Sequence, residues 1–514
     1  MPPGRRKAAV THGESRGGGK AVTASKEDRQ LELIPETADS PKGADDGRDR
    51  GRPRPRPRAV PKSGSTKRRD LPAMTMEEIA REENLVEAFE KVASNDGAPG
   101  PDRQTIDEVR VHLGTIVPAL MRTLLEGTYQ PGEIRRVWIP KAGGGQRGLG
   151  IPNVIDRMVQ QAVHQVLSPN YEPTFHRSSH GFRPERSCHT AIAEAKSYLE
   201  EGYEWVVDID LERFFDRVHH ERLLSRLEKR VKDRQLIALI RRMLKAKVVM
   251  PDGVVVTTGE GTPQGGPLSP LLSNIVLDEL DWELDRRGHR FVRYADDGNI
   301  YVRSRRSGER VMASVRSFIE KRLRLKVNEA KSAVARPEER HFVGFRLRRE
   351  PETGDVEVEL SERSKERINE TIRQKTPRNR GTSLETIIRE LNGYLAGWLG
   401  FFWIVTGETA KRTLHNLDAH IRRRLRALLL KQWKRKRSIV RRLIKLGIRQ
   451  ETAWKTVYEG RRRTWDLSAR AVLNRALDKA YFAERGLMTL EQRWLERRTR
   501  VIAPTPIQLT LDLG

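Results

Sequence analysis

The sequence of 514 residues contains a single cysteine, Cys188, and no long apolar run. One thiol excludes a disulfide framework and a zinc site built on thiolates, and it fits a reducing cytoplasm. The longest apolar stretch, YLAGWLGFFWIV (394–405), is too short to span a bilayer, and no signal peptide opens the chain. These absences predict a soluble intracellular protein without a membrane partner.

Acidic residues are also in deficit, since 98 Lys and Arg stand against 70 Asp and Glu. The formal charge of +28 and the pI of about 10.4 exceed what solubility alone requires. Such an excess usually indicates a polyanionic partner, most often nucleic acid. A chain of this length has room for several domains and a substantial core.

The composition changes along the chain and predicts an α+β fold followed by a helical region. Residues 1–70 are rich in Gly, Pro, Lys and Arg, which predicts a disordered basic arm. Strand and helix patterns alternate from about residue 204 to residue 345. Beyond about residue 360 the strand signal ends, and the helices become increasingly basic.

Two groups of aspartates lie in the region of alternating patterns. Asp208 and Asp210 share one face of a predicted strand, while Asp296 and Asp297 form the turn of the hairpin FVRYADDGNIYV. An isolated Asp–Asp pair more often caps a helix or occupies a turn. If the hairpin lies beside the strand, however, the carboxylates meet and form an oxygen-only site of the kind that Mg²⁺ prefers.

The motifs around these aspartates resemble those of group II intron-encoded reverse transcriptases of the bacterial type. The resemblance runs from about residue 84 to the C-terminus, and its blocks stand in the family's order. They are NDGAPGPD, RRVWIPKAGGGQRGLGIPNVIDRMVQQA, HGFRPERSCHTAI, DIDLERFFDRVHH, TPQGGPLSP, YADD, LKVNEAKS and HFVGF.

The resemblance implies a right-hand polymerase fold, with fingers and an antiparallel palm sheet followed by an all-helical thumb. The expected divisions are a basic arm (1–70), fingers with an N-terminal extension (71–200), a palm (201–345), a thumb or maturase domain (346–450) and a basic DNA-binding-type tail (451–514). Family members that have an endonuclease domain carry paired cysteines there. A chain with one cysteine therefore predicts no homing endonuclease.

The resemblance assigns catalysis and the binding of two Mg²⁺ ions to Asp210, Asp296 and Asp297. Asp208 is expected to be structural and Asp216 to begin or cap a helix. Phe215 resembles the steric gate that excludes a ribose 2′-hydroxyl, which favours dNTP over NTP.

The remaining predicted site residues contact the substrates. Lys141 and Arg147 flank a Gly-rich turn and resemble the pair that holds the incoming triphosphate. Gln264 belongs to an element that lies against the nascent base pair. Lys331 resembles the lysine that protonates the departing pyrophosphate, and Gly344 the primer grip.

The chain is therefore predicted to be an RNA-directed DNA polymerase that binds its intron RNA, assists its splicing and copies it into DNA during retrohoming. The expected partners are intron RNA, a DNA target or primer and dNTPs, in a bacterial cytoplasm or at the nucleoid. Two alternatives stay open: a domesticated defence- or repair-associated reverse transcriptase without an intron, and a splicing factor that only binds RNA. The bulk of Phe215 argues against an RNA-dependent RNA polymerase.

Overall fold

The computed structural model describes residues 71–140, 146–257, 259–262, 265–379, 381–459 and 463–502. The predicted basic arm at 1–70 lies outside these ranges. The chain divides into two units, of which the first is formed by Met1–Val166, Ala238–Thr258 and Pro263–Pro267 and the second by the remainder. Among the helices of the described residues, none combines the length and apolar character needed to cross a bilayer.

The first unit contains helices around a four-stranded sheet of order β2-β1-β4-β5. Strand patterns on either side of the Gly-rich turn at 141–148 predict a hairpin, and it is present, because β1 pairs antiparallel with β2 and Trp138 stands opposite Gly148. Its elements are α1 (Met76–Ile79), α2 (Glu82–Ser94), α3 (Ile106–Val111), α4 (Leu113–Leu125), β1 (Ile134–Pro140), β2 (Gln146–Ile151), most of α5 (Val154–Tyr171), the end of α8 (Arg234–Leu244), β4 (Val248–Val249) and β5 (Val255–Val256).

Apolar residues at three- and four-residue spacing predict one helix over residues 74–95, but the structure divides it. The stretch MTMEEIAREENLVEAFEKVASN forms α1 and α2, because Arg81 between them adopts extended dihedral angles (φ −59°, ψ 137°). The helix expected directly after the strand at Trp205–Ile209 is also only a short 3₁₀ helix, η3 (Phe214–Asp216), which begins behind a left-handed Arg213 (φ 48°). Asp216 is the last residue of η3 and does not cap the following helix α7 (His220–Glu228), whose N-cap is His219.

The second unit is built on a four-stranded sheet of order β6-β7-β3-β8. β3 is one of the two inner strands and pairs antiparallel with both β7 and β8. Val206 and Val207 of β3 point to opposite faces of the sheet and are both buried, so both faces are covered at this strand. Its elements up to this sheet's last strand are α6 (Cys188–Glu200), β3 (Trp205–Ile209), α7 (His220–Glu228), α9 (Ser269–Arg286), β6 (Arg290–Tyr294), β7 (Asp297–Val302), α10 (Arg305–Phe318) and β8 (Ala333–Ala335).

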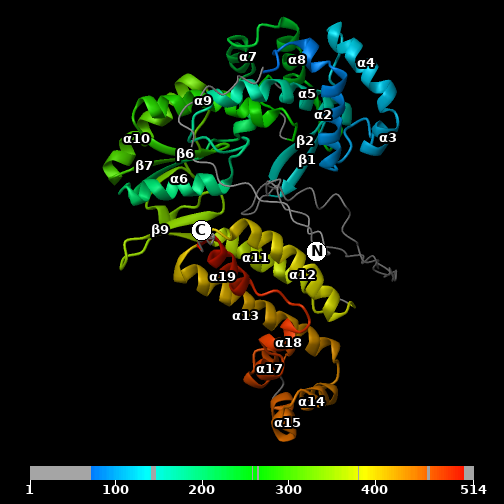
Figure 1. Ribbon diagram of the computed structural model, residues 1–514, viewed down its shortest axis with the longest axis vertical. Coiled ribbons are helices and arrows are strands. Elements are labelled where there is room, and N and C mark those ends of the chain that lie inside the picture. The colour runs from blue at the N-terminus through cyan, green and yellow to red at the C-terminus, as the bar shows by residue number, and fades with distance from the viewer. Residues whose placement is uncertain are drawn as a thin grey trace, which may run out of the picture. The chain divides into compact units, whose positions relative to one another are not determined.

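A two-stranded antiparallel sheet and a series of helices complete this unit (Figure 1). They are β9 (Phe345–Arg349), β10 (Val356–Leu360), α11 (Glu362–Lys375), α12 (Leu384–Phe402), α13 (Gly407–Gln432), α14 (Lys436–Lys445), α15 (Gln450–Tyr458), α16 (Thr464–Leu467), α17 (Ala471–Ala476), α18 (Lys479–Ala483) and α19 (Leu490–Ile502). The predicted α+β sheet region followed by helices is therefore confirmed.

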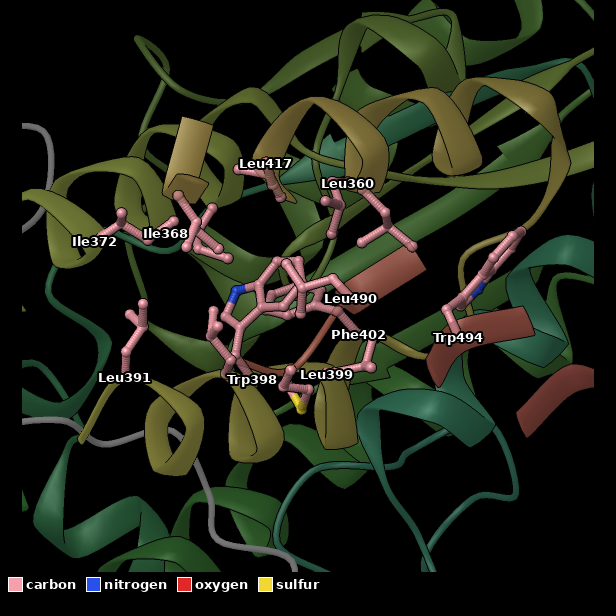
Figure 2. Packing of buried hydrophobic residues seen from close by; sticks show 14 of the residues in the cluster. Leu360, Ile368, Ile372, Leu391, Trp398, Leu399, Phe402, Leu417, Leu490 and Trp494 are labelled. Carbon is pink, nitrogen blue, oxygen red and sulfur yellow. The ribbon is translucent and has the colours of Figure 1, made fainter. Parts of the chain in front are cut away.

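The core of the helical region collects side chains from α12, α13 and α19 (Figure 2). Trp398 and Phe402 of α12 are buried and so belong to the core, whereas Phe401 and Trp403 are half-buried. Leu490 and Trp494 of α19 belong to the same cluster, and the Trp494 indole donates a hydrogen bond to the Val405 carbonyl (3.1 Å). α19, the last described helix, thus packs into the same core as α12.

Candidate active site

Asp210 follows the last residue of the inner strand β3, and its backbone is held from the β8 side. Its amide donates to the Ser332 hydroxyl at 3.0 Å. Its carbonyl accepts from the Asn328 amide at 2.8 Å. The Asp210 side chain remains 28% exposed, so the backbone is fixed while the carboxylate faces solvent.

The hairpin β6–β7 places the other two aspartates at the same end of the sheet. Tyr294 pairs with Asp297, so Ala295 and Asp296 form a two-residue turn. Ile209 of β3 pairs with Gly298 of β7, and continuing this register by one residue brings Asp210 opposite Asp297. The sequence prediction that the strand and the hairpin lie side by side is therefore confirmed.

Lys331 lies on the other side of Asp210. Lys331 ends the turn that precedes β8, and its amide donates to the Asn328 carbonyl at 3.2 Å. The Lys331 ammonium is 3.7 Å from an Asp210 carboxylate oxygen and is 62% exposed. The cation assigned to proton donation thus lies beside a carboxylate of the predicted metal site.

Asp208 is paired within the protein. The Arg340 guanidinium contacts its carboxylate at 2.6 Å. Burial raises the pKa of Asp208, while the charge and hydrogen bond of Arg340 act against this rise. An inward carboxylate that is satisfied by an arginine fits the structural role expected of Asp208.

Phe215 is held by its backbone in η3. The Phe215 carbonyl accepts from the Thr262 amide at 2.6 Å, and Gly261 (φ +100°) lets that segment approach closely. The side chain is half-buried, whereas that of Phe214 is buried. Gln264, expected next in this segment, lies outside the described residues.

The predicted triphosphate residues belong to the first unit. Arg147 is exposed on β2, opposite Ile139 of β1. Lys141 lies outside the described residues. Gly148 leaves room for Arg136, whose guanidinium donates to the Gly148 carbonyl at 3.0 Å.

Gly344 connects the sheets to the helical region. It has a φ of +93°, which favours glycine. Its carbonyl accepts from the Ser361 amide (3.1 Å) and the Ser364 hydroxyl (2.7 Å). A Cβ here would meet Phe402 and Ser364 at 3.4 Å, so the close backbone contact seen at Gly344 is with α11 and α12.

The turn that carries Asp296 is supported by residues that no sequence motif marks. Arg293 of β6 and Asp281 of α9 form a fully buried ion pair beneath it, with 2.5 Å between the guanidinium and the carboxylate. Gly181 lies against the turn from another side, because a Cβ at this position would come within 2.2 Å of the Ala295 nitrogen. The available signal was the strand period, which places the charged Arg293 on the same face as Phe291.

The three aspartates suit a magnesium site by their chemistry. All their donor atoms are carboxylate oxygens, which Mg²⁺ prefers. Within the described part of the chain, no three His, Cys, Asp or Glu side chains stand close enough to hold a metal ion by themselves. Mg²⁺ usually keeps several waters and uses substrate phosphates as ligands, so the site stays a prediction.

Comparisons with known proteins agree with the motifs and the fold. Residues 139–347 match the family "Reverse transcriptase (RNA-dependent DNA polymerase)", and residues 365–446 match "Group II intron, maturase-specific domain". Protein YkfC of Escherichia coli (strain K12) is 33% identical over 352 residues, which cover 60% of this chain and 90% of YkfC.

Two further relatives are intron proteins by name. The group II intron-encoded protein LtrA of Lactococcus lactis subsp. cremoris is 42% identical over 166 residues, which cover 32% of this chain and 27% of LtrA. The putative COX1/OXI3 intron 2 protein of Saccharomyces cerevisiae is 33% identical over 223 residues, covering 43% of this chain and 25% of that protein. These two matches span about a quarter of each relative. With two family domains in order and a relative matched over nearly its whole length, the chain belongs to the group II intron reverse transcriptase/maturase family and is a reverse transcriptase.

Proposed function

We propose that this reverse transcriptase extends a DNA primer on an RNA template with two Mg²⁺ ions held by Asp210, Asp296 and Asp297. The observation that carries the proposal is the order of the sheet, because β3 and the β6–β7 hairpin bring all three carboxylates to one end. Bound Mg²⁺ would activate the primer 3′-hydroxyl and neutralise the leaving pyrophosphate.

The chain's own residues would position the substrates and move the proton. Lys141 and Arg147 would bind the triphosphate, Gln264 would lie against the nascent base pair, and Gly344 would serve the primer grip. The Phe215 ring would fill the space of a 2′-hydroxyl. Lys331 would donate a proton to the pyrophosphate, and its ammonium already lies beside Asp210.

We further propose that the helical region binds intron RNA, assists its splicing and then takes part in copying it at a DNA target. The maturase-specific match covers α11 to α13 and reaches the end of α14. Exposed cations on α14 offer phosphate contacts, which position RNA without reading its sequence. The printed names of LtrA and of the yeast intron protein support an intron partner. The expected location is a bacterial cytoplasm, at the nucleoid when DNA is bound.

The polymerase proposal is tested by primer extension on poly(rA)/oligo(dT) with Mg²⁺. Wild type is compared with the double variant Asp296→Ala, Asp297→Ala and with Asp252→Ala, which changes an aspartate of another hairpin. We expect dTTP incorporation by wild type and Asp252→Ala and its loss in the double variant. A folded, RNA-binding wild type that incorporates no dTTP would refute polymerisation and favour the splicing-only alternative.

The intron partner is tested separately. RNA transcribed from the DNA that surrounds the reading frame is incubated with the protein, and excision is followed at low Mg²⁺. Splicing that is stimulated by wild type and by the Asp296→Ala, Asp297→Ala variant supports a maturase whose RNA role is independent of polymerisation. A reading frame without surrounding intron RNA would favour the domesticated alternative.

A further inference from the structure

The turn that carries Asp296 contains a strained residue. Ala295 has a φ of +56°, a left-handed conformation that alanine rarely adopts. Such a residue persists only where its surroundings determine it. The neighbouring contacts should therefore explain how the turn is held, and with it the direction of the Asp296 carboxylate.

Arg293 uses all five of its side-chain N–H donors in these contacts. Two donate to the Asp281 carboxylate at 2.8 and 2.5 Å, and one donates to the Ser179 hydroxyl at 2.7 Å. The remaining two reach the Asn274 side-chain oxygen at 3.0 Å and the Ala295 carbonyl at 2.8 Å. The guanidinium thus joins the turn to α9 and to the segment before α6.

Further contacts hold the turn through Asn274, Gly181 and the backbone of Arg293. The Asn274 amide group donates to the Gly181 carbonyl at 2.9 Å, and Gly181 lies directly against the Ala295 backbone. Arg293 also exchanges backbone hydrogen bonds with Ser178 and His180, both at 2.8 Å. Asn274 and Asp281 are seven residues apart and so share one face of α9.

A simple stabilising role does not explain such a cluster. The Arg293 and Asp281 side chains are 2% and 0% exposed, and removing two charges from water costs more than packing apolar side chains of similar volume. The pair instead fixes the positions of its neighbours, because a planar guanidinium holds five acceptors in defined places. One of these acceptors is the carbonyl of the strained turn residue.

We infer that Arg293 is a positioning residue for the polymerase reaction: through Ala295 it fixes the turn that carries Asp296, with Asp281 and Asn274 as its supports. This inference rests on the proposed role of Asp296. Lysine would keep the charge of Arg293 but cannot supply the five fixed donors. Arg293→Lys therefore tests the role of the hydrogen bonds separately from that of the charge.

The first experiment measures the turn directly, in the full chain without metal or nucleic acid. Hydrogen exchange of the peptide that spans residues 291–299 is compared between wild type, Arg293→Lys and Leu224→Ala. Leu224 is buried in α7, which packs against α9, but it makes none of the Arg293 hydrogen bonds, so it serves as a control for lost stability. We expect faster exchange in this peptide for Arg293→Lys alone, at a temperature where all three proteins are folded.

The second experiment separates kcat from binding. A turn that is misplaced by about 1 Å should lower kcat roughly 10–100-fold. The dissociation constant for template–primer should stay within about twofold, because Arg293 is buried and contacts no solvent-facing surface. Leu224→Ala should lower the melting temperature but keep kcat. If Arg293→Lys does not fold, Asn274→Ala and Ser179→Ala each remove one acceptor and leave the ion pair in place.

The two experiments distinguish the possible failures. Unchanged exchange in the 291–299 peptide, together with a kcat like that of Leu224→Ala, would overturn the positioning role. A wild type that does not polymerise would remove the proposed function, whereas the exchange measurement would still report whether Arg293 holds the turn.

Discussion

Phe215, the proposed steric gate, is held in place by its backbone. Its carbonyl is held by the Thr262 amide, so the ring position depends on backbone contacts and not on the ring's own packing alone. Shortening the side chain should therefore open space without moving η3. The neighbouring Phe214 is buried and provides the contrasting position.

We predict that Phe215→Ala raises the incorporation of UTP relative to dTTP by at least about tenfold, because the volume that excludes the 2′-hydroxyl is lost. Primer extension with the two nucleotides in parallel measures this ratio. Phe214→Leu serves as the control and should leave the ratio unchanged while lowering stability. An unchanged ratio in Phe215→Ala would remove the gate assignment.

Asp278 gives a prediction on pH. Burial, followed by the charge of Asp281, raises the pKa of Asp278 from 3.8 to about 6 in the folded protein. The folded state then binds this proton more tightly than the unfolded chain. Stability is gained as the pH falls through about 6 and lost as it rises.

Asp278→Asn should therefore be more stable than wild type at pH 8, by roughly 1–3 kcal/mol, and the difference should shrink toward pH 5. Urea unfolding at the two pH values gives the free energies. Asp252→Asn, at an exposed turn, should show no such trend. A variant that is less stable than wild type at pH 8 would contradict the prediction.

Sequence patterns predict the site residues that a motif marks, but they do not predict the residues that support them. Asp210, Asp296 and Asp297 stand out as carboxylates in a strand and a turn, and the sheet brings them to one end. Arg293 could not be selected, because its partners Asp281 and Ser179 lie on other elements and its charge looks ordinary in so basic a chain. Only the three-dimensional contacts reveal that all its donors are used.

At the scale of elements, α19 depends on a buried carboxylate of another helix. Asp418 of α13 is 3% exposed and accepts from the amides of Leu490 (2.9 Å) and Glu491 (3.1 Å), which begin α19. These bonds satisfy helix N-terminal donors that would otherwise be buried without partners. The contact also joins α19 to α13, which lie side by side (Figure 1).

Asp418→Ala should lower the free energy of unfolding by about 1–3 kcal/mol, because two buried donors lose their acceptor. Chemical denaturation measures the loss, and limited proteolysis should cut near residue 489 first. Glu408→Ala, on an almost fully exposed side chain of the same helix, is the control. Equal stability of the two variants would show that Asp418 does not cap α19.

The elements themselves were largely predictable, and their partners were not. The hairpin of β1 and β2 follows from two strand patterns around a Gly-rich turn, and α12 from its apolar period. The parallel pairing of Ile134 with Val248 has no local signal, since the two strands are distant in sequence. The break at Arg81 was missed because no Pro or Gly marks it.

At the scale of the whole molecule, the main feature is the excess of positive charge. The net charge is +28, and some of the basic residues lie exposed on α14, namely Arg437, Arg441 and Lys445. Cations of this density repel one another unless phosphates neutralise them. Binding to RNA should accordingly be strong in low salt and should weaken steeply as salt rises.

Replacing Arg437 and Arg441 by Gln should reduce the slope of log K against log salt for RNA binding by about 2, if each contacts one phosphate. Filter binding between 50 and 200 mM KCl measures the slope. Arg306→Gln with Arg310→Gln removes the same charge from the exposed side of α10 and should leave the slope nearly unchanged. Equal slopes for both pairs would show that net charge alone, and not α14, determines binding.

The inner place of β3 in its sheet has a consequence for synthesis on the ribosome. Asp208 pairs with Asn299 on one side and with Ala333 on the other, so the strand gains its second neighbour only after residue 333 has been made. At about 5–20 residues per second, the time between translation of β3 and translation of β8 is roughly 6–25 s. A nascent chain that stops before β8 already contains Asp210, Asp296 and Asp297, yet β3 still has an open edge. The aspartates are therefore translated before the sheet that carries them is complete.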